Sequence, residues 1–598
     1  MNGKQPIVST LLAITLGLAA AVSAQEKNTQ QTAKSEEIMK PIHISVESRE
    51  LHRVDARLFG QFLERPSWGE TGPEIATDDK GKLSAEVVDM LRAMRIPIVR
   101  FPGGTDIDYI DWTDMISNAP GRAPERPVTT GHTGQQVGNR FGYDEYLRLA
   151  ADLDWESILV VNFLDGLAKR KPLAEAARHA AGLVAYANAP LGAKLPEGMP
   201  DWPAIRARNG HPEPYGVKTF QIGNEWKVGG FWRKAGKRLG SDEPEVLIPW
   251  FQECIIAYAD AMRAVDPEIE LIVDGEMGRI ERPGGEKLEL AAAVLADPEI
   301  RKRAKYATFH CYASGQMDNV KRDGADVDPT TMRPEQYWLA ITAMPGAYDD
   351  TGISRAMAKP WYGAAHLQSV RQLGYEVVNT EWNWNCWGKA PVNLGEGIDW
   401  RHGAAIGAAG FLNGLLRQAD DVSLATQSML LGHRWGIAAI RVDKQGKNAR
   451  FNAQGAATAF YSRHHGDRML EIRTDGVPRT PQPFSVVNTP PVARLALLDT
   501  VATRSDDKVY LHVINRAYDR DLEAEIDLSA LGLPDGEAVL HLLEGTPPDQ
   551  VAARKAWMSE RRLAVPLAGG KARVLFPKRS VAVLEAGIKQ GKQQRIKP

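Results

Sequence analysis

The stretch VKTFQIGNEW, residues 217–226, decides which fold the sequence predicts. Residues 217–222 form an extended run that is typical of a strand, and Gly223 ends this run abruptly. Asn224 and Glu225 follow at the carboxyl end of the strand, which is the end where parallel barrels carry their active sites. The stretch therefore predicts a barrel strand that presents a carboxylate at its end.

A second carboxylate has a similar setting in EVVNTEWNWNCW, residues 376–387, where a short apolar run ends at Glu381. Four tryptophans follow it: Trp382, Trp384, Trp387 and Trp400. Two carboxylates at strand ends suit the hydrolysis of a sugar bond, because one can act as the acid and the other as nucleophile or base. The tryptophans either offer flat surfaces to sugar rings or pack the rim of the barrel.

The chain alternates between strand-like and helical patterns. Eight strand-like runs occupy residues 58–62, 98–101, 157–163, 217–222, 271–274, 306–310, 376–380 and 423–427. Helical patterns such as residues 84–94 and 250–265 separate them, which predicts an α/β fold, a (β/α)₈ TIM barrel over residues 58–437. A doubly wound sheet is the alternative, but no GxGxxG or GxxxxGK[ST] turn follows a strand. Glu225 follows the fourth run and Glu381 the seventh, so both are expected at one rim.

The pattern changes after residue 437. Short strand-like segments separated by turn residues, such as 508–515 and 580–585, predict a C-terminal antiparallel β-sandwich domain over residues 438–588. An N-terminal strand within residues 41–57 is expected to join this sandwich. Residues 589–598 are basic and are expected to form a frayed tail.

The first 24 residues resemble a secretory signal peptide. Lys4 precedes an apolar run over residues 7–21, and small residues at 22–24 suit cleavage before Gln25. This predicts a secreted or periplasmic protein without a membrane span once the signal is removed, since the run is shorter than the roughly 20 residues that cross a bilayer. An uncleaved membrane anchor is the alternative. Residues 25–40 are polar and predict a disordered lead-in.

Composition argues against several partners and cofactors. The net charge of the 598 residues is −2, which argues against nucleic acid or an anionic membrane as the main partner. Three cysteines do not make a disulfide framework, and no CxxC or HExxH motif predicts a metal site. Hydrolysis by two carboxylates and water needs no cofactor, so none is expected. A homo-oligomer is left open, because one chain does not reveal the oligomeric state.

Neighbouring strand ends supply further candidates. In IVRFPGGT, residues 98–105, Arg100 either reaches the site or only orders the barrel mouth, and the paired glycines permit close approach of backbone to a ligand. Glu64 follows the first strand and either accepts sugar hydroxyls or pairs with Arg65 or Arg100. The aspartates of DIDYIDWTD, residues 106–114, are expected to be mostly loop caps or solvated groups.

His310 and Tyr312 lie in the motif FHCY at the end of the sixth strand. The Tyr312 hydroxyl is expected to hydrogen-bond the nucleophile and hold it ionised. His310 taken alone is more often a core histidine with satisfied hydrogen bonds. Gln427, at the end of the eighth strand, either donates to a sugar hydroxyl or is structural.

These motifs together resemble glycoside hydrolase family 51, the α-L-arabinofuranosidases. The resemblance rests on GQFLE (60–64), RFPGG (100–104), NRFGYDEY (139–146), VVNF (160–163), IGNE (222–225), HCY (310–312) and TEWN (380–383). It implies a retaining barrel enzyme with Glu225 as general acid/base and Glu381 as nucleophile. Burial and the nearby anion are expected to keep Glu225 protonated.

The resemblance also implies a subsite for the terminal sugar, with Asn224 hydrogen-bonded to the 2-hydroxyl. Thr105 departs from the family, which usually has Cys or Asn at this ligand-touching position. The predicted substrate-binding residues are Glu64, Arg100, Thr105, Asn224, Tyr312, Trp382 and Gln427.

The function that the resemblance implies is exo-acting release of terminal α-L-arabinofuranose from polysaccharides or oligosaccharides. The departures leave other sugars open: a galactofuranoside, a D-arabinofuranoside, a β-xyloside or a β-glucan. A non-catalytic sugar-binding protein on a degenerate barrel is the alternative of a different class.

Overall fold

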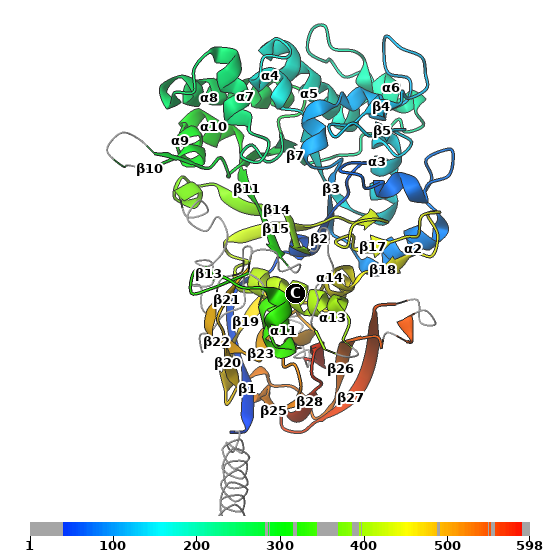
Figure 1. Cartoon of the computed structure of the whole chain (residues 1–598). Helices are drawn as coiled ribbons and strands as arrows, with labels where there is room; N and C mark the ends of the chain where they lie inside the picture. Colours follow the sequence, from blue (N-terminus) through cyan, green and yellow to red (C-terminus); the bar gives the residue numbers. More distant parts are fainter. Residues whose placement is uncertain are drawn as a thin grey trace, which may run out of the picture.

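The computed structural model describes residues 40–281, 285, 287–314, 320–343, 369–385, 394–395, 398–486, 489, 491–547, 549–551 and 556–588. The expected signal peptide, most of the lead-in, the basic tail and Trp387 lie outside the described residues. Within these ranges the chain forms a closed barrel and a strand-rich C-terminal region (Figure 1). No helix of the described residues is long and apolar enough to span a bilayer.

Eight parallel strands close the barrel in the order β11-β14-β15-β2-β3-β6-β7-β8. Their bounds are β2 Gly60–Phe62, β3 Ile98–Phe101, β6 Glu156–Val161, β7 Thr219–Ile222, β8 Glu270–Asp274, β11 Tyr306–Ser314, β14 Glu376–Asn385 and β15 Val422–Ser428. Each overlaps one of the eight predicted runs, which confirms the (β/α)₈ fold. All four residues of β7 are buried, as expected for a parallel sheet that is covered on its outer face by helices.

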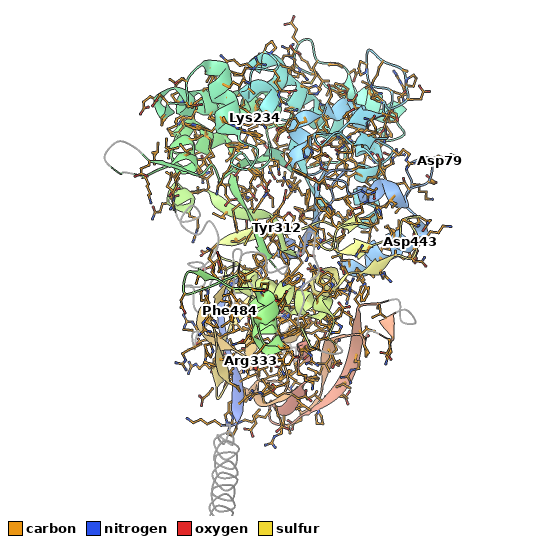
Figure 2. All side chains as sticks on the ribbon, in the orientation of Figure 1. Asp79, Lys234, Tyr312, Arg333, Asp443 and Phe484 are labelled. Carbon is orange, nitrogen blue, oxygen red and sulfur yellow. The ribbon has the colours of Figure 1, made fainter. Side chains whose placement is uncertain are left out.

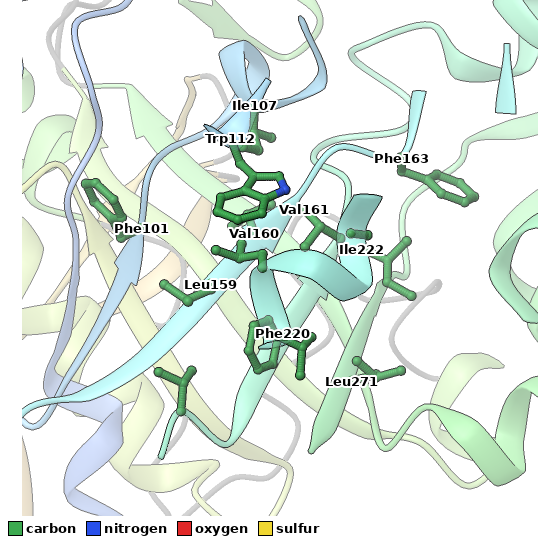
Figure 3. Close-up of a cluster of buried hydrophobic side chains, with 14 of the residues drawn as sticks. Phe101, Ile107, Trp112, Leu159, Val160, Val161, Phe163, Phe220, Ile222 and Leu271 are labelled. Atoms are coloured by element: carbon green, nitrogen blue, oxygen red, sulfur yellow. The ribbon is translucent and has the colours of Figure 1, made fainter. Parts of the chain in front are cut away.

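Helices surround the barrel (Figure 1). Their bounds are α2 Ala85–Met94, α3 Tyr143–Leu153, α4 Leu164–Leu167, α5 Leu173–Asn188, α6 Trp202–Arg208, α7 Phe231–Leu239, α8 Pro244–Arg263, α9 Leu290–Leu295, α10 Pro298–Arg303, α11 Pro334–Thr342 and α13 Trp400–Arg417. Apolar side chains such as Phe101, Val160 and Phe220 are fully buried around β3, β6 and β7 (Figure 3). This packing fixes the strands, so their carboxyl ends meet at one rim.

The C-terminal region is built on a nine-stranded sheet in the order β27-β26-β29-β24-β23-β19-β1-β25-β28. The bounds are β1 Ile42–Arg53, β19 Arg468–Asp475, β23 Leu498–Arg504, β24 Lys508–Asn515, β25 Leu522–Asp527, β26 Gly536–Gly545, β27 Met558–Leu567, β28 Lys571–Phe576 and β29 Ser580–Gly587. β1 lies inside this sheet, antiparallel to β19 but parallel to β25. The sheet is therefore not wholly antiparallel, because one of its strands comes from before the barrel.

The chain between the barrel and this sheet forms a helix. The first strand of the large sheet after the barrel begins at Arg468, whereas the sequence suggested a boundary at residue 438. Helix α14, Ala453–Arg463, fills the interval and packs against α13 and α2. Its alanines bury both sides of the helix, so a regular amphipathic pattern is missing from the sequence.

Short strands form small additional sheets on the loops. They are β4 Thr129–Thr130, β5 Gln136–Val137, β9 Arg279–Glu281, β10 Lys287–Glu289, β12 Lys321–Arg322, β13 Ala325–Asp326, β16 Leu431–Gly432, β17 Ile440–Arg441, β18 Arg450–Phe451, β20 Arg479–Gln482, β21 Phe484–Ser485 and β22 Val492–Ala496. β16, β17 and β18 form one three-stranded sheet just beyond the end of β15, so the chain stays with the barrel for some distance after its last strand.

Candidate active site

A cavity of about 420 Å³ lies at the carboxyl ends of the barrel strands. Its lining consists of Phe62, Glu64, Trp68, Gly104, Thr105, Asn224, Glu225, Val228, Tyr312, Glu381, Ser428 and Trp435. Tyr312, near the carboxyl end of β11, lies near the middle of the molecule in Figure 2. The volume is within the range of about 300 to 1,000 Å³ that is usual for small-ligand sites.

Glu225 and Glu381 face each other across this cavity, with His310 between them. The Oε1 atom of Glu225 lies 2.9 Å from His310 Nδ1, and Glu381 Oε2 lies 3.6 Å from the same nitrogen. One oxygen of each carboxylate and this nitrogen lie within 4.8 Å of one another. Two side chains that are distant in sequence thus lie close together in the wall of one cavity. The spacing would also admit a divalent cation.

The turn after β7 holds Glu225 in a left-handed backbone conformation. Its φ is 46°, which a residue with a side chain adopts only when its surroundings enforce it. Two buried aspartates supply that enforcement: Asp108 accepts from the backbone N–H of Asn224 at 3.0 Å, and Asp274 accepts from that of Trp226 at 2.7 Å. The carboxylate is therefore aimed by hydrogen bonds on both sides of the residue.

Glu381 lies within β14, which continues to Asn385 instead of ending at residue 380. Arg100 donates to its Oε1 at 2.8 Å and the Tyr312 hydroxyl donates to its Oε2 at 2.7 Å. The Arg100 guanidinium is fully buried and also donates to Asn224 Oδ1 at 2.7 Å and Gln221 Oε1 at 2.9 Å. Arg100 therefore reaches the site and connects the two strand ends that carry the glutamates.

His310 is part of the site, although its sequence position alone favoured a core histidine. Burial lowers the pKa of its imidazole, but the charges of Glu381 and Glu225 outweigh burial and raise it to about 9. For Glu225, burial raises the pKa, but the hydrogen bond and charge of His310 outweigh it and the net direction is downward. This direction is opposite to the expectation that burial keeps Glu225 protonated, because the imidazole of His310 stabilises the charged carboxylate.

Glu64 forms no ion pair with Arg65 or Arg100 in the part of the chain that is described, because those cations pair with Asp106 and Glu381. Burial raises the pKa of Glu64 to about 8, assisted by the charge of Glu381. Its side chain lines the cavity, where a neutral carboxyl group can both donate and accept.

Asn224 and Thr105 also reach the cavity wall. The Nδ2 atom of Asn224 is buried and has no hydrogen-bond partner among the described residues, while its Oδ1 is bound by Arg100. A buried donor without a partner is costly, and a sugar hydroxyl would satisfy it. Gly104 brings the backbone close to this donor: a Cβ built on it would lie 3.6 Å from Asn224 Nδ2 and 3.3 Å from Glu381 Oε1.

Gly104→Ala is expected to lower kcat/KM by about 10²-fold, because its methyl group would occupy space beside the Glu381 and Glu64 carboxylates where the sugar is expected to lie. The 3.3 Å contact of the new Cβ with Glu381 Oε1 is tighter than usual, so a loss of stability is expected beside the loss of activity. Steady-state kinetics and a thermal melt test both points. Gly410→Ala is the matched control, since its Cβ would meet only Arg516, at 3.8 Å. Equal activity of the two variants would contradict this placement of the sugar.

The structure does not bring Gln427 or Trp382 to the cavity. The amide of Gln427 is fully buried and is used by Gln61 at 3.2 Å and Thr458 at 2.9 Å. Trp382 follows Glu381 on a strand, so its side chain faces the opposite side and stacks on Phe411 of α13, with ring centroids 4.4 Å apart. Both residues are structural here, which corrects the prediction that they bind substrate.

Trp384 and Trp400 also pack on the exterior of the barrel. Trp384 is fully buried, donates to the Ile341 carbonyl at 2.7 Å and stacks on Trp400. The tryptophans that line the cavity are instead Trp68 and Trp435. Trp68 is 51% exposed and was missed; its only signal was a tryptophan in the turn that follows GQFLE.

Asp106 and Asp108 are buried, whereas most aspartates of this loop were expected to be caps or solvated. Asp108 accepts from the backbone N–H groups of Phe163 and Leu164 at 2.8 and 3.2 Å as well as from that of Asn224. Burial raises its pKa to about 7, although these three hydrogen bonds oppose the rise. The carboxyl group thereby ties the loops after β3, β6 and β7 together beneath the site.

A parallel barrel that brings two carboxylates together in a sugar-sized cavity has the architecture of a glycoside hydrolase. Comparisons with known proteins support this class. The family model for the "Alpha-L-arabinofuranosidase 1 domain" matches residues 90–323. The chain is 25% identical over 81% of its length to an intracellular exo-α-(1→5)-L-arabinofuranosidase of Streptomyces lividans, and 28% identical over 37% of its length to one of Bacillus subtilis.

A solved structure supports the fold. The family 51 α-L-arabinofuranosidase from Thermotoga petrophila superposes with a TM-score of 0.64 and 20% identity, covering 91% of this chain and all of that one. Together these likenesses confirm the resemblance drawn from the sequence: the chain is similar to α-L-arabinofuranosidases in its sequence and to a family 51 member in its fold. The sequence matches span 65% of the Streptomyces enzyme and 39% of the Bacillus enzyme.

The comparisons contradict the predicted export. Relatives from Streptomyces lividans and Bacillus subtilis are both named intracellular, so the prediction of a secreted or periplasmic protein is wrong. That prediction rested on composition alone: one lysine, one apolar run and a few small residues. The residues concerned lie outside the described part of the chain.

Proposed function

We propose that this protein is a retaining, exo-acting glycoside hydrolase that releases terminal α-L-arabinofuranose. The observation that carries the proposal is the meeting of Glu225 and Glu381, whose nearest ligand oxygens lie within 4.8 Å of each other in a cavity. Retaining enzymes hold their carboxyl groups about 5 to 5.5 Å apart, whereas inverting enzymes leave about 6.5 to 9.5 Å for a water molecule. The short separation supports retention.

In the first step Glu381 attacks the anomeric carbon and the bond to the departing oxygen breaks. Arg100 and Tyr312 orient the attacking carboxylate, each through one of its oxygens. Glu225 protonates the departing oxygen with the proton that it shares with His310 across 2.9 Å. The products of this step are a glycosyl ester on Glu381, a neutral His310 and the released alcohol.

In the second step water attacks the anomeric carbon of this ester, and Glu225 accepts the proton of that water. Ester formation has removed the negative charge of Glu381, which was one of the charges that raised the pKa of His310. Release of the sugar restores that charge and returns the proton to the Glu225–His310 pair. The sugar leaves with retained configuration, because the anomeric carbon has been displaced twice.

The identity of the sugar rests on the relatives and on the unpaired donor in the cavity. Arabinofuranose is named for the relatives from Streptomyces and Bacillus. Asn224 Nδ2 stands beside the reacting carboxylates and is assigned to the 2-hydroxyl of the sugar, while neutral Glu64 serves a second hydroxyl. The linkage of the sugar is left to experiment.

A panel of 4-nitrophenyl glycosides tests the proposal: α-L-arabinofuranoside, β-D-galactofuranoside, β-D-xylopyranoside and β-D-glucopyranoside, with Glu381→Ala as the blank. The highest kcat/KM is expected for the arabinofuranoside. Higher activity on a pyranoside would reject the sugar assignment. Binding of arabinose by both proteins without turnover by either would instead identify a sugar-binding protein.

The alkaline limb of the activity profile is expected near pH 9, where His310 loses its proton. Below this pH the pair holds one proton for the departing oxygen; above it Glu225 and His310 have none to give, so kcat/KM falls as pH rises. His310→Asn removes the second proton site, and the limb is expected to move at least about one pH unit lower. His211→Asn, a histidine stacked on Tyr215 away from the site, is the control. An unchanged limb in His310→Asn would contradict the shared proton.

A further inference from the structure

A second cluster of ionisable side chains joins α14 to the C-terminal sheet. His464 follows the last residue of α14, His541 lies on β26 and Glu585 lies on β29. β26 and β29 are neighbours, and His541 stands opposite Val583, two residues from Glu585. Side chains two apart on a strand share one face, so His541 and Glu585 project from the same face of the sheet.

The three side chains are spaced like the ligands of a metal ion. Glu585 Oε2 lies 3.5 Å from His464 Nδ1 and 3.3 Å from His541 Nε2. All three atoms lie within 4.8 Å of one another, and the two imidazole rings are 4.0 Å apart. Ligands bound about 2.1 Å from a tetrahedral zinc ion are separated by about 3.4 Å. The two distances from Glu585 Oε2, 3.5 and 3.3 Å, match this separation between neighbouring ligands.

The two histidine nitrogens lie at ion-pair distance from Glu585 Oε2 but do not meet it in hydrogen-bond geometry. His464 and His541 are only 6% and 5% exposed, yet neither His464 Nδ1 nor His541 Nε2 has a partner in hydrogen-bond geometry. Buried polar atoms are normally satisfied, and an ion between them would satisfy both at once. Lys508 donates to the other oxygen of Glu585 at 2.6 Å, which orients the carboxylate and leaves Oε2 for the ion.

We propose that His464, His541 and Glu585 bind a divalent transition-metal ion, for which zinc is the best match. Two imidazoles and one carboxylate are a zinc ligand set, with water in the fourth position. The ion would tie the end of α14, which packs on the barrel helices, to two strands of the sheet. The bound ion would stabilise the contact between the barrel and the sheet. This site is independent of the proposed hydrolysis.

Zinc binding to the full-length protein tests the proposal by calorimetry and by metal analysis after gel filtration. The wild type is expected to retain zinc at the cluster and to melt at a higher temperature with zinc than with a chelator. His541→Ala and Glu585→Gln are expected to lose at least about tenfold in affinity. His43→Ala is the matched control, because His43 forms a 3.1 Å pair with Glu525 in the same sheet, and it should bind as the wild type does.

Glu225, His310 and Glu381 in the active site have a spacing similar to that of the proposed metal ligands. A variant of this second group is therefore needed to show which of the two groups binds zinc. Glu225→Gln is expected to keep the zinc that His541→Ala loses; the reverse result would overturn the proposal. The visible spectrum of the cobalt-loaded wild type adds a test that needs no variant to fold. Strong absorption of tetrahedral cobalt, abolished by added zinc, is expected. A weak octahedral spectrum, or no metal uptake at micromolar zinc, would refute the site.

Discussion

Glu381→Gln is expected to lose nearly all turnover, on the order of 10⁴-fold or more in kcat/KM. The amide keeps the size of the side chain and an oxygen for Arg100 or Tyr312, which hydrogen-bond the carboxylate at 2.8 and 2.7 Å. It carries no negative charge to attack the anomeric carbon, so the glycosyl ester does not form. Initial rates on 4-nitrophenyl α-L-arabinofuranoside measure the loss, and a thermal melt shows that the variant remains folded.

Glu64→Gln provides the comparison for this loss. It changes another carboxyl group of the same cavity, whose pKa is raised to about 8, so the neutral amide replaces a group that is already largely neutral near pH 7. A reduction of less than about 10²-fold is expected, which reflects one altered hydrogen bond to the sugar. If Glu381→Gln lost no more than Glu64→Gln, Glu381 would not be the nucleophile.

Glu225→Ala is expected to separate substrates by their leaving groups. For a poor leaving group such as the alcohol of an oligosaccharide, the loss is about 10²- to 10⁴-fold, because nothing protonates the departing oxygen. For 4-nitrophenolate, the first step needs little protonation, and the loss is confined to the second step, where water lacks its base. Rates on arabino-oligosaccharide and on the nitrophenyl glycoside, measured side by side, give the ratio.

Azide distinguishes this role from simple damage to the site. As a nucleophile that needs no base, it is expected to restore turnover of the nitrophenyl glycoside by Glu225→Ala and to leave Glu381→Gln unchanged. Equal losses of Glu225→Ala on both substrates, without azide rescue, would contradict its assignment as acid/base. Glycosyl azide of retained configuration from Glu381→Gln would exchange the two roles.

The barrel could be predicted from the sequence because each strand is a short apolar run that ends at a polar residue or at a glycine. The stop at Gly223 placed Glu225 at a strand end, and the run before Glu381 placed the second carboxylate. The length of β14 could not be predicted in this way. Trp382 and Trp384 alternate with polar residues beyond Glu381, and a strand continues through them because their rings pack on α13 and near α11.

The sequence indicated the acidic residues of the site better than it indicated the residues that control their protonation. Strand ends indicated Glu225, Glu381, Arg100 and Tyr312, and the structure brings these four together. The strand-end position of His310 did not reveal its role, because that role arises from two carboxylates that approach it from other strands. Contacts of this kind depend on barrel closure, which local sequence does not encode.

For Gln427 the sequence suggested a place in the site that the structure does not give it. It ends the eighth strand as the glutamates end theirs, yet its amide is held in the interior by Gln61 and Thr458. A strand end indicates the rim of a barrel but not the direction of a side chain, which depends on register against the neighbouring strands. Trp68 lies in an irregular turn, where neither hydrophobic periodicity nor strand register predicts the direction of a side chain.

The configuration of the first-formed product tests the central claim, that Glu225 and Glu381 act across one sugar as acid/base and nucleophile. The wild type would be incubated with 4-nitrophenyl α-L-arabinofuranoside in the presence of methanol, and the methyl glycoside would be followed by proton NMR. Two displacements predict methyl α-L-arabinofuranoside, with configuration retained. Inverted product, formed by a single displacement, would contradict the account.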